Sequence, residues 1–114
     1  MFETLISKLQ DDKYLTLETT PQHEPSMHNI VEKIKKFKID SKVDGFTCTD
    51  NPLAKLKYNS LFAALKLQQE FKKPVIATMT MRDRNKIALQ SDLLGANDFD
   101  IRAILALTGD PANM

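Results

Sequence analysis

Four apolar runs, each separated from the next by a helical pattern, constrain most strongly what this chain can fold into. They occupy residues 14–20, 43–50, 74–80 and 101–110, and each carries threonine near its end with a carboxylate or an Asp-containing loop close behind. Strands that alternate with helices pair in parallel through right-handed crossovers, and units of about thirty residues have the size of a βα repeat. The sequence therefore predicts an α/β fold of about four parallel strands whose polar ends meet on one face, where such folds carry their chemistry.

Helical spacing before and between the first two runs predicts two helices. The first should end at Asp11-Asp12, and its apolar face is formed by Phe2, Leu5, Ile6 and Leu9. The second has Ser26 as its candidate N-cap. Its inward residues are Met27, Ile30, Val31, Ile34 and Phe37.

Two further helices are predicted between the later runs. One should stop at Lys72-Lys73-Pro74, and it packs through Leu53 or Leu56, Leu61, Leu65 and Phe71. The other begins at Asn85 and ends near Gly95. Its inward residues are Ile87, Ala88, Ser91 and Leu94.

Two layouts accommodate this alternation of strands and helices. One is a complete, four-stranded, doubly wound domain, and the other is the first half of a (β/α)8 TIM barrel, which needs about 250 residues. Periodicity alone does not choose between them. The chain stops four residues after Asp110, where a helix should cover the last strand. We therefore favour the half barrel, and we expect residues 1–114 to be a fragment of a longer chain.

Composition describes one small domain of ordinary balance. The 114 residues are 42% hydrophobic and 27% charged, with a formal net charge of +1, so no general field attracts nucleic acid or a membrane. The apolar runs are far shorter than a membrane span, and the first residues lack a secretory pattern. A single cysteine, Cys48, fits a reducing compartment. We expect a cytoplasmic protein with no nucleic-acid and no membrane partner.

Two carboxylates are candidates for chemistry. Glu18 lies within an apolar strand, where desolvation would favour its protonated form and a proton-donor role. A salt-bridged or solvent-facing strand residue is an equally good interpretation. Asp110 follows Gly109, which lets the backbone approach a flat ligand, and the acid can accept from ring N–H groups. A simple turn aspartate before proline explains Asp110 equally well.

Hydroxyl groups and polar loops gather at the ends of the same runs. Five threonines there are able to hydrogen-bond a planar cofactor, although β-propensity explains any one of them: Thr47, Thr49, Thr78, Thr80 and Thr108. In the polar loop Arg82-Asp83-Arg84-Asn85, the arginines either meet an anionic group or tie the loop together. His23 and His28 lack metal-ligand spacing, so we expect no metal. The absence of a Gly-x-Gly-x-x-Gly motif disfavours a Rossmann site.

Five segments, in order along the chain, resemble a known family. They are Leu17-Glu18-Thr19-Thr20-Pro21, Thr49-Asp50-Asn51-Pro52, Met79-Thr80-Met81-Arg82-Asp83-Arg84-Asn85, residues 88–96 and Leu105-Ala106-Leu107-Thr108-Gly109-Asp110-Pro111. Together they resemble the methylenetetrahydrofolate reductases, flavin enzymes of one-carbon metabolism, and the bacterial branch most closely. The resemblance implies a (β/α)8 barrel more than twice this length. It also implies FAD at the carboxyl ends of the strands and hydride transfer from NADH or NADPH to methylenetetrahydrofolate, although some relatives take electrons from a protein partner.

The resemblance also implies roles for individual residues. Glu18 matches the general acid that helps open the folate imidazolidine ring, and Asp110 matches the aspartate that tunes the flavin and holds the folate. Thr49 matches a flavin-contacting threonine. Leu107, Thr108 and Gly109 match the backbone that lies along the flavin. Thr78 and Thr108 stand where many members have histidine and arginine, and with Thr80 they complete the predicted FAD-binding set.

Because the resemblance covers only half of that barrel, we expect the isolated 114-residue chain to bind FAD poorly and to lack reductase activity. The expected small molecules are methylenetetrahydrofolate and NAD(P)H, and a homo-oligomer or an electron-donor protein partner is also compatible with the family. Two other functions stay open from the residues. One is a non-catalytic half-barrel interaction or remnant domain, and the other is a pterin-binding methyltransferase that uses no flavin.

Overall fold

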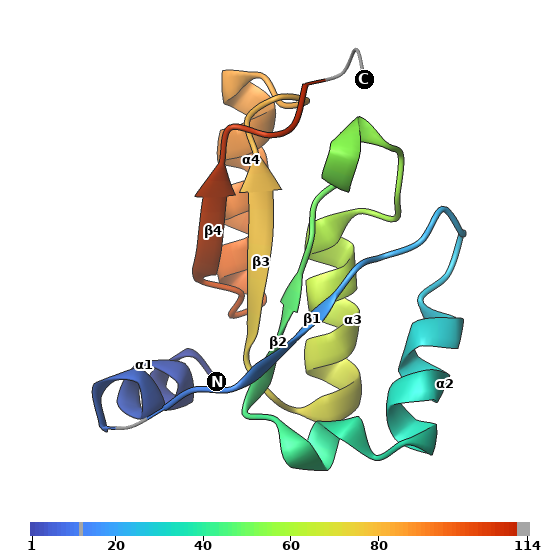
Figure 1. Cartoon of the computed structure of the whole chain (residues 1–114). Coiled ribbons are helices and arrows are strands. Elements are labelled where there is room, and N and C mark those ends of the chain that lie inside the picture. Colours follow the sequence, from blue (N-terminus) through green and yellow to red (C-terminus); the bar gives the residue numbers. More distant parts are fainter. Residues whose placement is uncertain (12, 112–114) are drawn as a thin grey trace.

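A parallel sheet forms the centre of the computed structural model, which describes residues 1–11 and 13–111 (Figure 1). Within these residues the sheet has four strands in the order β1-β2-β3-β4. The strands are β1 (Thr16–Thr19), β2 (Gly45–Cys48), β3 (Val75–Thr80) and β4 (Ala103–Leu107). All three neighbouring pairs are parallel, which confirms the predicted strand arrangement.

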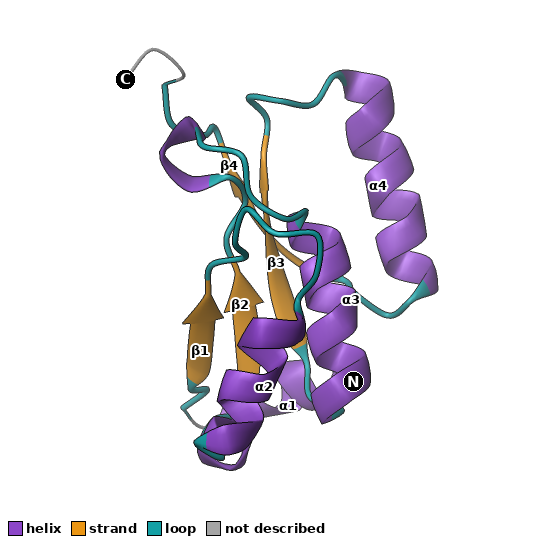
Figure 2. Cartoon of the chain, turned by 90° about the vertical axis from the view of Figure 1, so that its right-hand side faces the viewer, coloured by secondary structure: helices purple, strands orange, loops and turns teal. Residues whose placement is uncertain are grey.

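Three of the four helices in the described residues lie between strands in sequence and cover one face of the sheet (Figure 2). The four helices are α1 (Phe2–Asp11), α2 (His28–Lys36), α3 (Ser60–Phe71) and α4 (Lys86–Asp98), with short 3-10 turns η1 (Ile39–Lys42) and η2 (Pro52–Ala54). Figure 2 shows α2, α3 and α4 on the same side of the strands, while α1 lies at their amino ends. A doubly wound sheet reverses its strand order and carries helices on both faces. Sequential order with helices on one face instead matches half of a (β/α)8 barrel, as predicted.

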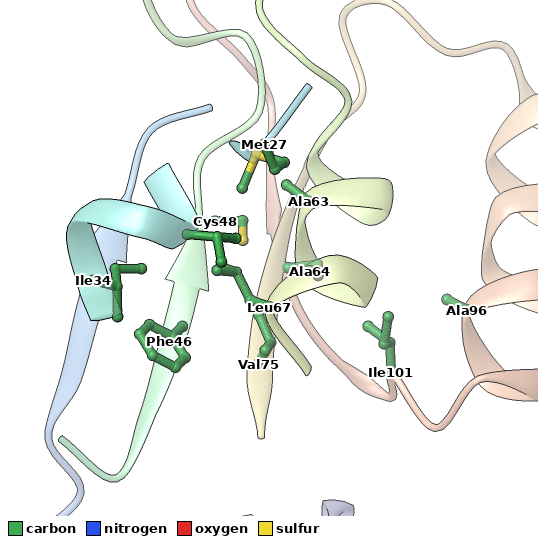
Figure 3. Packing of buried hydrophobic residues seen from close by; sticks show 12 residues of the cluster. Met27, Ile34, Phe46, Cys48, Ala63, Ala64, Leu67, Val75, Ala96 and Ile101 are labelled. Carbon is green, nitrogen blue, oxygen red and sulfur yellow. The ribbon is translucent and has the colours of Figure 1, made fainter. Parts of the chain in front are cut away.

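The core lies between the sheet and these helices (Figure 3). Alternate strand residues point to opposite faces, so Phe46, Cys48 and Ala77 all face α3 and are fully buried. Leu67 of α3 is also 0% exposed and packs in the same cluster. Burying a large apolar side chain stabilises a fold by about 1.5–3 kcal/mol. Burial also raises the pKa of the Cys48 thiol to about 11, although a hydrogen bond from Thr19 opposes the shift.

Helix α2 differs from the prediction at both ends. Its N-cap is Met27, and the Ser26 hydroxyl accepts a hydrogen bond from the His28 amide at 2.9 Å instead of capping the helix itself. Met27, Val31 and Ile34 are buried as predicted, and Ile30 packs against the core. Phe37 is 56% exposed because it is the C-cap and lies beyond the last helical turn, so its predicted inward position is wrong.

Helix α3 begins later than one predicted alternative requires. The Asn59 side chain caps it by accepting hydrogen bonds from the amides of Leu61 and Phe62. Leu53 and Leu56 therefore belong to the preceding loop and are 60% and 67% exposed, so their predicted packing is wrong. The remaining predicted contacts are confirmed, because Leu61, Leu65 and Phe71 pack against the core.

Helix α4 begins as predicted but faces the core differently. The Asn85 side chain accepts a hydrogen bond from the Ala88 amide at 2.8 Å, which confirms the predicted cap. Ile87 and Leu94 are 78% and 76% exposed and Ser91 is exposed, so these three inward positions are wrong. The helix has apolar residues on several faces, and the small Ala96 is its buried residue. Gly95 does not end it, because the helix continues to Asp98.

Helix α1 confirms the predicted leading helix and closes the amino end of the sheet. Leu5 is its buried residue, and the Phe2 ring lies 4.7 Å from the Arg102 guanidinium. Asp12, part of the predicted helix end, lies outside the described residues. The Met1 ammonium contacts the Asp100 carboxylate at 2.9 Å. None of the helices in the described part of the chain has both the length and the apolar character needed to cross a bilayer.

Candidate functional site

A cavity of about 660 Å³ lies on the face of the sheet that the helices leave open and extends over the carboxyl ends of the strands. Each strand supplies residues to it at every second position, because alternate residues share a face. The lining residues are Thr16, Glu18, Thr47, Thr49, Asp50, Pro52, Thr78, Thr80, Leu105, Leu107, Thr108, Gly109 and Asp110. Every residue that the sequence assigned to catalysis or cofactor binding is in this set, so the structure brings all of them together.

The cavity wall changes character from one strand to the next. Strands β1 to β3 contribute threonines and Glu18, whereas β4 contributes Leu105 and Leu107. In the strand register, Thr78 lies beside Leu105 and Thr80 beside Leu107. Hydroxyl groups thus adjoin an apolar strip, which is a suitable lining for a flat heterocycle with polar edges.

Glu18 is exposed on this open face, where it is paired in register with Thr47 of β2. Its apolar neighbour Leu17 points to the other face and packs against the core. In the described residues Glu18 therefore faces solvent and lacks the burial that its apolar strand suggested. The carboxylate is free to meet a ligand in the cavity.

The turn after β4 requires glycine for two reasons. Gly109 has φ +94°, which L side chains rarely adopt, and a Cβ there would lie 3.0 Å from the Arg82 Cβ and 3.2 Å from the Thr80 Cβ. Gly109 therefore lines the cavity with backbone atoms alone. Thr108, next to it, is exposed at the cavity rim.

Asp110 holds the loop that follows β2. Its Oδ2 accepts a hydrogen bond of 2.6 Å from the Leu53 amide. That loop contains Leu53 and Ala54 in the left-handed region, at φ 59° and 57°, a conformation that costs non-glycine residues about 1–2 kcal/mol each. The contact with Asp110 helps to keep the strained loop at the edge of the cavity.

Arg82 joins the polar loops around the cavity. Its guanidinium donates to the Asp110 carbonyl oxygen at 2.9 Å and to the Asn51 carbonyl oxygen at 3.2 Å, and it also pairs with Asp83. The hydrogen bond between the two side chains raises the pKa of Arg82 and lowers that of Asp83. Arg82 therefore ties the polar loops together, which is one of the two roles that the sequence suggested for it.

A second arginine forms a buried ion pair that sequence reasoning did not assign to the site. The Asp50 side chain is 1% exposed and contacts the Arg84 guanidinium, which also meets Asp92 of α4 at 3.1 Å. Burial lowers the pKa of Arg84, but hydrogen bonds with both carboxylates outweigh it and the net shift is upward. The signal in the sequence was the pair of polar loops after the second and third runs, which lie at the same edge of a parallel sheet.

Thr49 supplies the most direct sign that the cavity fits a polar ligand. Its hydroxyl oxygen is buried and has no hydrogen-bond partner within residues 1–11 and 13–111. A buried polar atom without a partner costs about 1–3 kcal/mol, and a ligand in the cavity can supply the missing bond. Together with the close approach at Gly109 and the strip of leucines, this hydroxyl makes the lining suited to a planar, hydrogen-bonding ring such as a flavin.

Comparison with known proteins identifies the family. The family model described as methylenetetrahydrofolate reductase matches residues 3–114. Searches of the curated proteins and of the solved structures found no match to the chain. The match covers the whole sheet, helix α1 from its second residue onward, the three later helices and every residue that lines the cavity. The chain belongs to the methylenetetrahydrofolate reductase family.

Proposed function

We propose that this chain supplies the first half of a flavin-binding (β/α)8 barrel, and that the complete barrel reduces 5,10-methylenetetrahydrofolate to 5-methyltetrahydrofolate. Membership of the family supports a folate-related oxidoreductase. The observation that carries the proposal is that Glu18 and Asp110 meet six threonines, among them Thr49, Thr78 and Thr80, at one cavity on the open face. The electrons come from NADH, NADPH or a protein donor.

The cofactor of the proposed reaction is FAD, which would carry a hydride from the donor to the folate. Thr49, Thr78 and Thr80 would hydrogen-bond its polar edges, and the leucines of β4 would pack against the ring. The backbone of Leu107, Thr108 and Gly109 would lie alongside it. The buried, unpartnered hydroxyl of Thr49 and the glycine-dependent turn support this placement.

Glu18 is the proposed general acid. Reduction of the methylene bridge requires opening of the imidazolidine ring, and a carboxylic acid beside that ring can donate the proton that its leaving nitrogen needs. The strands that complete the barrel would enclose Glu18, and the lower dielectric there would favour its protonated form. Its position on the open face, in register with Thr47, supports this role.

Asp110 is the proposed pterin anchor. One oxygen of its carboxylate, Oδ2, accepts the Leu53 amide, and the other remains available for ring N–H donors of the pterin. Because Arg82 fixes the backbone of the same residue at 2.9 Å, the carboxylate is presented from a tethered turn. Asp110 thus holds both a loop and a ligand at one edge of the cavity.

Anaerobic analysis of the purified full-length protein tests the proposal. We expect a yellow protein that releases FAD on denaturation, and whose flavin is reduced by a donor and reoxidised by methylenetetrahydrofolate. A colourless protein that binds tetrahydrofolate would favour the methyltransferase alternative. A protein that binds neither compound would favour an interaction domain. The same experiment on residues 1–114 alone should give weak FAD binding and no turnover.

A further inference from the structure

The buried carboxylate of Asp50 takes no part in the proposed reaction, yet it lies in the wall of the cavity. Its Oδ2 accepts hydrogen bonds from the Thr80 amide at 2.8 Å and from the Thr80 hydroxyl at 3.3 Å. Arg84 contacts the same oxygen and also donates to the Thr80 carbonyl oxygen at 3.1 Å. One ion pair therefore holds the amide, the carbonyl and the side chain of Thr80.

Stability alone is a poor explanation for this ion pair. Burying two charges has a desolvation cost that their attraction seldom exceeds, and apolar residues of similar volume often replace such pairs without loss of stability. Asp92, the second carboxylate on Arg84, is 37% exposed and belongs to α4. What Asp50 adds is an acceptor fixed beside a hydroxyl group that lines the cavity.

The chemistry of that hydroxyl follows from its partner. A threonine hydroxyl has one proton to donate and two lone pairs that accept. Paired with Arg84, the Asp50 carboxylate acts as an acceptor only, so the Thr80 hydroxyl must direct its proton to Asp50. Its lone pairs are what remains for a ligand in the cavity.

We propose that Asp50 is a positioning residue that sets the Thr80 hydroxyl as a hydrogen-bond acceptor, and that Thr80 thereby selects the ring N–H of the bound flavin. This inference rests on the proposed function. Oxidised flavin has one ring N–H, at N3, whereas its other polar edge atoms accept. The flavin is the partner because Thr80 is 4% exposed on the floor of the cavity, whereas Glu18 and Asp110, the proposed folate contacts, are exposed.

Binding of FAD and of its N3-methyl derivative to the protein as encoded tests the Thr80 contact. N3-methylation removes the ring proton and leaves the charge unchanged. We expect the unmodified protein to bind FAD at least tenfold more tightly than N3-methyl FAD. Thr80→Val should weaken FAD binding about tenfold or less, the effect of one hydrogen bond, and leave the affinity for N3-methyl FAD unchanged. Thr80→Ser, which keeps the hydroxyl, should restore the preference.

Variants of the two acids test the positioning role. In Asp50→Asn, the side-chain amide can donate a hydrogen bond to the Thr80 hydroxyl, which can then donate its own proton to a ligand. The preference for FAD over N3-methyl FAD should therefore shrink severalfold. Asp92→Asn is the matched control, because it removes a carboxylate from Arg84 but leaves the contacts between Asp50 and Thr80 in place. It should keep the preference even if its melting temperature falls. If Asp50→Asn does not fold, Thr80→Val and Thr80→Ser decide the question.

Several results would overturn the inference. An unchanged preference in Thr80→Val, or in folded Asp50→Asn, would show that the hydroxyl does not select the ring proton. If Thr80→Val weakened binding of 5-methyltetrahydrofolate but not of FAD, the hydroxyl would belong to the pterin. Equal binding of both flavins by the unmodified protein would overturn this inference alone. Failure to bind either flavin would overturn the proposed function together with it.

Discussion

The two faces of the sheet differ in almost every property, although the same four strands form both. The face that packs against α2 and α3 presents Phe46, Cys48 and Ala77, all fully buried. The open face presents Glu18, Thr47 and a row of further threonines. Because neighbouring residues of a strand point in opposite directions, residues adjacent in sequence have unrelated tasks. The covered face stabilises the fold, and the open face is available for ligands.

The largest effect is expected from breaking the covered face. Phe46→Ala removes a fully buried ring that lies 5.3 Å from the ring of Phe71, and large-to-small changes of this kind cost about 3–5 kcal/mol. Thr47→Val, one residue further on the open face, should change stability by no more than about 0.5 kcal/mol. Urea unfolding of both variants measures the difference. Equal losses would mean that the two faces are not distinct.

A large catalytic effect is expected from Glu18 on the open face. Glu18→Gln keeps the shape of the side chain but cannot act as an acid, and loss of a general acid typically costs at least about 100-fold in rate. In the protein as encoded, folate reduction should fall by that factor, while flavin reduction by the electron donor stays within about twofold. Rapid-mixing kinetics separates the two half-reactions. Equal losses in both would refute the acid role.

Thr49→Val should change the stability of the free protein and its affinity for FAD in opposite directions. Its buried hydroxyl oxygen has no partner in the described part of the chain, so Thr49→Val removes a cost and should stabilise the free protein by about 1 kcal/mol. The same change should weaken FAD binding about tenfold or less, because the ligand loses a hydrogen-bond partner. Thermal unfolding and flavin titration measure the two quantities. A destabilised variant with normal FAD affinity would contradict this role.

The smallest effect is expected at the amino end of the sheet, at Asp100, which does not line the cavity. Hydrogen bonds with the Met1 ammonium and with Arg102 lower the pKa of Asp100 from 3.8 to about 2. A depressed pKa gives stability above the unfolded value that is lost as pH falls through the folded value. Asp100→Asn should therefore lower the free energy of unfolding by no more than about 1 kcal/mol at pH 6, since the carboxylate is partly exposed. Below pH 2 the substitution should not change it.

Acid titration of unfolding checks this prediction, and flavin affinity is the control. The stability curves of wild type and Asp100→Asn should converge between pH 4 and pH 2, with FAD binding at neutral pH unaffected. A constant gap down to pH 2 would show that the ion pairs of Asp100 do not cause the difference.

The strands, and the meeting of the candidate site residues at one cavity, could be predicted from the sequence for a common physical reason. Threonines and acids that follow buried parallel strands must emerge at the same edge, so Glu18, Thr49 and Asp110 could be placed together without coordinates. Asn85 was recognisable as a cap because its side chain satisfies an amide that the first turn leaves free. These features depend on local chemistry and on strand alternation.

The errors arose where tertiary packing decides between equivalent local choices. In α4, apolar residues occur on several faces, so periodicity could not show that Ala96 faces the core and that Ile87 and Leu94 do not. Leu53 fitted a helical pattern, but the contact of its amide with Asp110 holds it in a loop. The buried pair of Asp50 and Arg84 joins residues thirty-four positions apart. The polar loops indicated a shared edge of the sheet, but the sequence does not specify which of their side chains pair.

Mapping of FAD onto the backbone amides tests the central claim most directly, namely that the open face of the sheet is the flavin site. In a titration of the protein as encoded, followed by amide chemical shifts, the largest changes should occur at Thr49, Thr80 and Gly109. Amides that border the apolar groove between α3 and α4, such as those of Phe62 and Phe99, should not move. Large shifts in that groove, with none at the strand ends, would contradict the account.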